Sequence, residues 1–138
     1  MIIATVAVQV TAPSAFLVIS SHGGITAQAV GSGSVMDVGV TIDGEAMGNP
    51  AQRITIVPSS GLAQGTSPLA QAESWGFTVA SGSVAGPVAG GPPVTHTVSL
   101  IVRHVSGDPI NVGFPLDGGM GPFATSGVSR LTVQVINQ

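Results

Sequence analysis

The sequence contains no lysine, no cysteine and no tyrosine, and it carries little charge of either sign. Charged residues make up 7% of the 138 residues, against about 25% in an ordinary soluble domain. The lack of lysine excludes a P-loop phosphate lysine, a Schiff-base lysine and a lysine-rich nucleic-acid groove. The lack of cysteine excludes disulfides, cysteine-ligated zinc and iron–sulfur clusters.

The three arginines are the only permanently positive side chains, and the formal net charge is -3. Such a chain has no basic surface that could neutralise phosphates, so we expect neither a nucleic-acid nor a membrane partner. No apolar run reaches the roughly 18 residues of a membrane span. The apolar segment 2–10 lacks the positive start of a signal peptide, and its alternation of apolar and polar residues predicts a first strand instead.

Valine and isoleucine outnumber leucine, which favours sheet over helix because β-branched side chains fit a pleated surface. Glycine and proline, 20 and 10 residues, recur along the whole chain and interrupt every window of helical length. We therefore predict an all-β fold with negligible helix: one antiparallel β-sandwich domain over residues 1–138, jelly-roll-like, with eight or nine short strands. The expected strands are 2–10, 15–21, 24–30, 35–43, 53–57, 75–80, 94–105, 110–114 and 129–136, with long loops at 59–74 and 115–127.

Three residues are candidates for interface or ligand contact: His96, Trp75 and Arg103. His96 and His104 share a strand face but lie about 26 Å apart at eight residues' spacing, so they cannot share a metal ion within one chain. For His96, a hydrogen-bonded core or interface position is favoured over a metal or pH-sensing site at an oligomer axis. Trp75 is favoured as a core residue over a sugar-stacking platform.

The carboxylates show no catalytic pattern. Asp43 and Glu45 flank a glycine, which favours a hairpin turn over a facing acid pair. No nucleophile, base and orienting group can be placed together from the sequence, so we expect no enzyme activity, no cofactor and no metal.

Two stretches, 94–100 (VTHTVSL) and 129–135 (SRLTVQV), together resemble the closing half of C1q/TNF-like jelly rolls and of the related trimeric modules of phage virions. The resemblance implies a compact homotrimer with its chain ends near one another, and it brings no catalytic residue.

The low surface charge also favours permanent contacts between subunits. We therefore expect a non-enzymatic structural protein of a virus or phage particle, such as a capsid decoration or tail-associated subunit. Its partners would be its own copies and other virion subunits, and its place would be the virion, assembled in the host cytoplasm. The alternative is a lectin-like module that binds a carbohydrate or receptor on a tail tip, outside the cell or at a cell surface.

Overall fold

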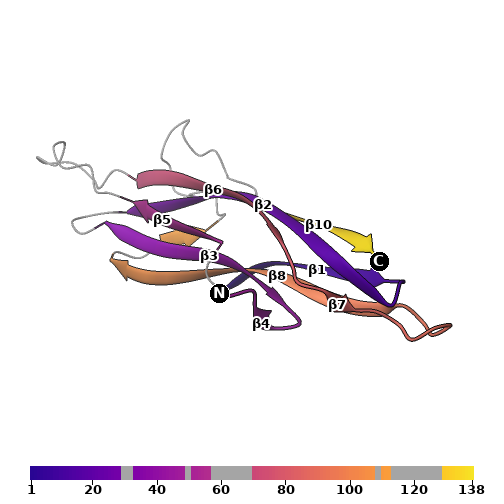
Figure 1. The fold of residues 1–138 in the computed structure, drawn as a ribbon. Helices are drawn as coiled ribbons and strands as arrows, with labels where there is room; N and C mark the ends of the chain where they lie inside the picture. Colours follow the sequence, from indigo (N-terminus) through magenta and orange to yellow (C-terminus); the bar gives the residue numbers. More distant parts are fainter. Residues whose placement is uncertain (29–32, 49–50, 57–69, 108–109, 113–128) are drawn as a thin grey trace, which may run out of the picture.

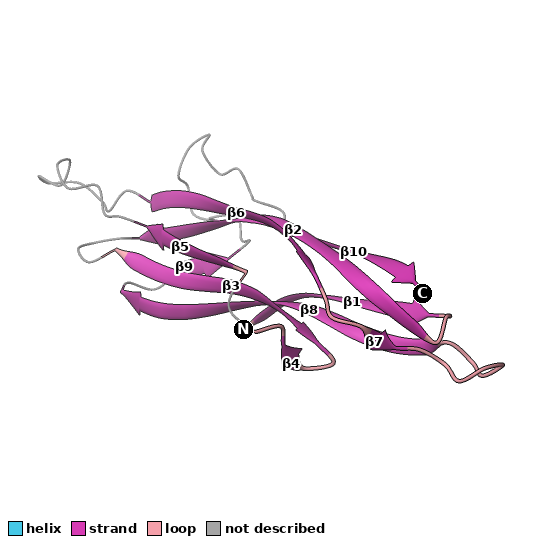
Figure 2. Cartoon of the chain, in the orientation of Figure 1, coloured by secondary structure: helices cyan, strands magenta, loops and turns pink. Residues whose placement is uncertain are grey.

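The computed structural model describes residues 1–28, 33–48, 51–56, 70–107, 110–112 and 129–138. They form strands, turns and loops without a helix (Figure 2), so none of them builds an apolar helix that could span a membrane. The predicted all-β fold is confirmed. The strands are β1 (Ile2–Val10), β2 (Ser14–Gln28), β3 (Ser34–Ile42), β4 (Glu45–Ala46), β5 (Gln52–Ile56), β6 (Ala70–Ala80), β7 (Val84–Ala85), β8 (Val94–Gly107), β9 (Ile110–Val112) and β10 (Arg130–Asn137).

The strands form two sheets that pack against each other as a β-sandwich (Figure 1). In the first, sheet A, the order is β1-β8-β3, and both β4 and β5 pair with the remaining edge of β3. In the second, sheet B, β2 is central: β10 and β6 flank it, and the short β7 and β9 also pair with it. All these pairs are antiparallel. The predicted sandwich is therefore confirmed.

The core lies between the sheets and follows the alternation of the sequence. One cluster joins Met36 and Leu100 of sheet A to Ile25 and Trp75 of sheet B. A second cluster continues along the sandwich, with Leu17 of β2 among its buried members. Since side chains alternate between the two faces of a strand, the intervening residues of each strand face outward and define the outer surfaces of the sandwich.

Strand β2 is longer than predicted. We predicted two strands, 15–21 and 24–30, separated at residues 22–23, because glycine usually weakens a strand, but β2 runs unbroken through Gly23. Gly23 pairs with Trp75 of β6, and the indole ring occupies the space that a Cβ of residue 23 would need. The glycine therefore permits a close approach within the sheet instead of ending it.

Three further differences concern extent and burial. Strand β6 begins at Ala70, inside the predicted loop 59–74, and the pairings of β4 and β7 bring the number of described strands to ten. The alternation in segment 35–43 is typical of a half-buried strand, but β3 is buried on both faces. Asp37 and Thr41 of its outer face are buried, and the side chains of Arg53 and Arg103 lie against Asp37. The predicted loop residues 59–69 and 115–127 lie outside the described residues.

The two chain ends lie apart (Figure 1). The Met1 ammonium donates to the carbonyl of Val102 at 2.8 Å, whereas the amide of Gln138 donates to the carbonyl of Ser14 at 3.0 Å. The side chain of Asn137 donates to Thr11, just beyond the far end of β1. The nine residues of β1 span about 30 Å, so the expectation of neighbouring chain ends is wrong.

Candidate functional site

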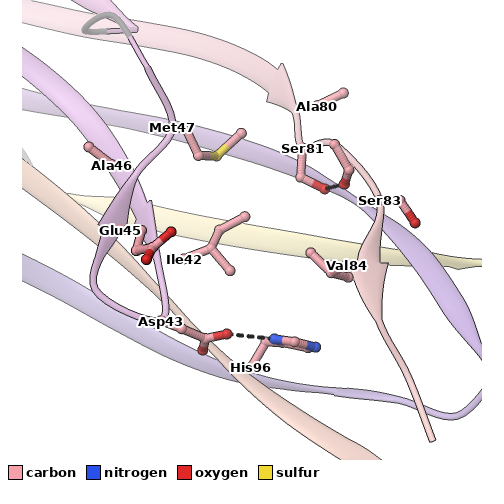
Figure 3. Close-up of a pocket in the computed structure, with 11 residues that line it drawn as sticks. Ile42, Asp43, Glu45, Ala46, Met47, Ala80, Ser81, Ser83, Val84 and His96 are labelled. Atoms are coloured by element: carbon pink, nitrogen blue, oxygen red, sulfur yellow. Dashed lines mark hydrogen bonds and ion pairs between the residues drawn. The ribbon is translucent and has the colours of Figure 1, made fainter. Parts of the chain in front are cut away.

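A pocket lies where the turn between β3 and β4 faces the segment between β6 and β7 (Figure 3). Its volume of about 650 Å³ is within the range of small-molecule sites. Sheet A contributes one wall and the end of β6 with β7 the other. The lining residues include Ile42, Asp43, Met47, Ser81, Val84 and His96.

The turn that carries Asp43 is held in place by its own backbone and by β8. Asp43 and Gly44 form a two-residue connection, and both have positive φ, 52° and 88°. Such a connection suits Asp-Gly, so the predicted hairpin turn is confirmed. The amide of Thr97 donates to Oδ1 of Asp43 at 2.8 Å, and the amide of Asp43 donates to the carbonyl of Thr97 at 2.8 Å.

His96 links the two sheets beside this turn. It lies on the inner face of β8, and only 10% of its side chain is exposed. Its Nδ1 lies 2.7 Å from Oδ2 of Asp43, and its Nε2 lies 2.7 Å from the carbonyl oxygen of Ala85 on β7. His96 therefore has the core position with satisfied hydrogen bonds that the sequence favoured.

Both partners of the imidazole are hydrogen-bond acceptors. A backbone carbonyl only accepts, so Nε2 must donate, and an ionised carboxylate only accepts, so Nδ1 must donate as well. This arrangement therefore favours the imidazolium form of the ring. The Asp43 carboxylate, and after it the Ala85 carbonyl, raise the pKa of His96 above 6.5, against the opposing effect of burial. The Thr97 amide, and after it His96, lower the pKa of Asp43 below 3.8.

A serine, a histidine and an aspartate line this pocket, but they are not arranged as a nucleophilic triad. That chemistry needs the serine hydroxyl to be hydrogen-bonded to the imidazole nitrogen that does not contact the aspartate. Here that nitrogen, Nε2 of His96, donates to Ala85. The hydroxyl of Ser81 instead donates to the carbonyl of Gly82 at 2.6 Å and accepts from the amide of Leu17 at 2.8 Å. Ser81 thus fastens the β6–β7 segment to β2.

Arg103, the second candidate residue, lies elsewhere, on the outer face of sheet A. Its Nη2 donates to Oδ2 of Asp37 at 2.7 Å. Arg53 donates to the same carboxylate through Nε to Oδ1 at 2.7 Å and through Nη2 to Oδ2 at 3.0 Å. Hydrogen bonds from Arg53 first and Arg103 second lower the pKa of Asp37 from 3.8 to about 2, although its burial acts in the opposite direction.

Trp75, the third candidate, lies in the core with 2% of its surface exposed. Its indole Nε1 donates to the hydroxyl of Ser21 at 3.0 Å, and that hydroxyl donates to the carbonyl of Arg130 at 2.9 Å. The ring therefore offers no face for stacking on a sugar, and the three candidate residues lie in three separate places.

Within the described ranges, no group of three or more histidine, cysteine or acidic residues is placed to hold a metal ion. Comparison with protein-family models, with curated proteins and with solved structures finds no match to this chain.

Proposed function

We propose that this chain is a non-enzymatic structural subunit that works through protein–protein contacts, as a homotrimeric capsid decoration or tail-associated component of a phage particle. The observation that carries the proposal is the lack of charge on the outer face of sheet B. Charges on a surface keep copies of a protein apart, and this face has almost none.

Beside the first half of β2, that outer face consists of apolar, hydroxyl and amide side chains. Phe16 lies beside Ile136, and Val18 lies between Gln134 and Ala80 in the strand register. Phe16 and Val18 are half-buried, and Ile136 is exposed. The next row along the sheet is Thr132, Ser20 and Thr78, with a 2.9 Å hydrogen bond between the hydroxyls of Ser20 and Thr78. Ionisable side chains, His22 and Arg130, follow only in the row after that.

We therefore place the contact between copies on this patch, defined as Phe16, Val18, Ala80, Gln134 and Ile136. Burying apolar side chains on a subunit interface is favourable by about 25 cal/mol per Å² removed from water. An isolated charge buried in the same interface opposes association strongly.

Size-exclusion chromatography with light scattering tests the proposal. The wild-type chain is expected to elute as a trimer, and Val18→Lys is expected to shift the chain to monomer. Gln9→Lys is the matched control, because Gln9 is an exposed residue of β1 on sheet A; it is expected to remain a trimer. A wild-type chain that is monomeric at micromolar concentration contradicts self-association, and its absence from purified native particles by mass spectrometry contradicts the virion assignment.

A second candidate function is a carbohydrate- or receptor-binding module, and the 650 Å³ pocket beside His96 favours it. In that case the polar groups would come from Asp43 and Glu45, not from Trp75. Binding to a glycan array that Glu45→Gln abolishes and Trp75→Phe preserves would support this candidate.

A further inference from the structure

The outer face of sheet A carries a compact group of three ionised side chains, one from each of three neighbouring strands. Asp37 of β3 lies between Arg53 of β5 and Arg103 of β8 in the strand register. Only 5% of the Asp37 side chain is exposed, whereas Arg53 and Arg103 are 56% and 70% exposed. Two guanidinium groups and one carboxylate leave one positive charge in excess, on a chain whose net charge is -3.

The contacts with Asp37 fix the positions of the two guanidinium groups but use only some of their N–H donors. Arg53 uses Nε and one Nη2 hydrogen, and Arg103 uses one Nη2 hydrogen, toward this carboxylate. Each guanidinium has five N–H donors, so both residues retain donors for a further acceptor at an exposed surface. Because their geometry is already fixed by a buried carboxylate, a second carboxylate loses less side-chain entropy when it binds them.

A hollow adjoins Arg103 and Asp37 of this group. Its volume is about 160 Å³, below the 300–1,000 Å³ typical of drug-sized ligands, and it suits a single side chain. Its floor and walls are mostly small or apolar. The residues that line it include Asp37, Gly39, Ala46, Gly48, Ile101 and Arg103.

We propose that this hollow binds one acidic side chain, a glutamate or aspartate, of a partner protein, with its carboxylate held by Arg103. The inference rests on the proposed function, because it identifies how a protein partner is recognised on sheet A. Charge complementarity indicates the occupant: the hollow offers apolar contact for a short aliphatic stem and guanidinium donors for its end. A nucleic acid does not fit, since two exposed arginines neutralise too few phosphates.

The probe for this site is N-acetyl-glutamate N-methylamide, with N-acetyl-glutamine N-methylamide as its uncharged match. In ¹H–¹⁵N spectra of the full chain, the glutamate probe is expected to shift the Nε–H of Arg103 and the amides of Gly39 and Gly48 saturably at millimolar concentration. The glutamine probe is expected to leave them in place. Equal shifts with both probes, or none with either, would overturn the proposal without requiring any variant to fold.

Two variants with the same change in charge then locate the effect. Arg103→Gln is expected to weaken binding of the glutamate probe about tenfold, because it removes charge-assisted hydrogen bonds. Arg130→Gln removes an arginine from sheet B and is expected to bind like the wild type. Equal weakening by both variants would show a general effect of net charge and would refute the assigned site.

This experiment separates the site from the proposed function. If the chain forms trimers or enters particles but does not bind the glutamate probe, the site is wrong and the structural role stands. If the chain is a monomer absent from particles yet binds the probe at Arg103, the hollow is a carboxylate site and the structural role is wrong.

Discussion

Raising the pH above neutrality is expected to destabilise this fold through His96. The pKa of His96 is raised above its unfolded value of 6.5 by Asp43 and Ala85. A group with a raised folded pKa stabilises the native state fully below the unfolded pKa. That stabilisation is lost as the pH rises through the folded pKa. Deprotonation leaves one ring nitrogen without a hydrogen opposite an acceptor at 2.7 Å.

The size of the effect follows from the geometry. A hydrogen bond to a charged group contributes about 1.5–3 kcal/mol. The Asp43 side chain is 50% exposed, so solvent screening favours the lower end of that range. We therefore expect the free energy of unfolding to fall by about 1.5 kcal/mol between pH 5.5 and pH 9. Each unit by which the pKa of His96 in the folded state exceeds 6.5 corresponds to a loss of about 1.4 kcal/mol.

Urea denaturation between pH 5.5 and 9 measures this loss, in a range where the carboxylates stay ionised. His96→Gln is expected to be about 2 kcal/mol less stable than wild type at pH 5.5, with a pH profile that is nearly flat. His104→Gln is the matched control, because it removes an exposed imidazole from the same strand and is expected to keep the wild-type slope. A wild-type profile that is flat, or one whose slope survives in His96→Gln, would refute the assignment of an imidazolium between two acceptors.

Four other substitutions test the packing around Trp75 in sheet B and the ionic group of sheet A. Gly23→Ala places a methyl group against the ring of Trp75 and is expected to lower the free energy of unfolding by about 1–3 kcal/mol in urea denaturation. Gly76→Ala is the control: its added Cβ meets open space, so the free energy of unfolding is expected to change little or to rise slightly. Trp75→Phe is expected to cost about 1–3 kcal/mol, because it leaves a buried serine hydroxyl without its indole donor. The lowered pKa of Asp37 implies stabilisation that is present above pH 3.8 and lost as the pH falls toward about 2. After screening by solvent, we expect the free energy of unfolding to fall by about 1–2 kcal/mol over this range. Asp37→Asn is expected to lack this acid-induced fall.

The fold was predictable because its signals are local. The alternation in segments 2–10, 94–105 and 129–136 is visible over a few residues, and the corresponding strands lie close to the predicted bounds. The continuity of β2 was not predictable in this way. It depends on the contact of Gly23 with Trp75, 52 positions further along the chain, and sequence alone does not show that a ring will fill the space left by a glycine.

The candidate site was predictable only in its parts. Asp43 was recognised as a turn residue and His96 as a core residue, but their hydrogen bond depends on the register of β3 against β8, which local patterns do not determine. A usable signal existed for the other cluster. Asp37 interrupts a strand that is otherwise apolar or small on both faces, and a carboxylate in that position needs partners when it is buried. Since the chain has only three arginines, Arg53 and Arg103 were natural candidates for that role.

The scarcity of charge and the proposed association have a common structural basis. On sheet A, Asp37 is paired with two of the chain's three arginines, and Asp43 is paired with His96 beside the pocket. These ionised groups stabilise contacts between strands within one chain, so they contribute little net repulsion between chains. Over the patch of Phe16, Val18, Ala80, Gln134 and Ile136 there is no charge at all to oppose the approach of a second copy. A single lysine at position 18 therefore changes the electrostatics of that patch more than the same substitution would on an ordinary protein surface. For this reason, the light-scattering comparison of Val18→Lys with Gln9→Lys distinguishes a subunit that associates through this patch from a domain that stays monomeric.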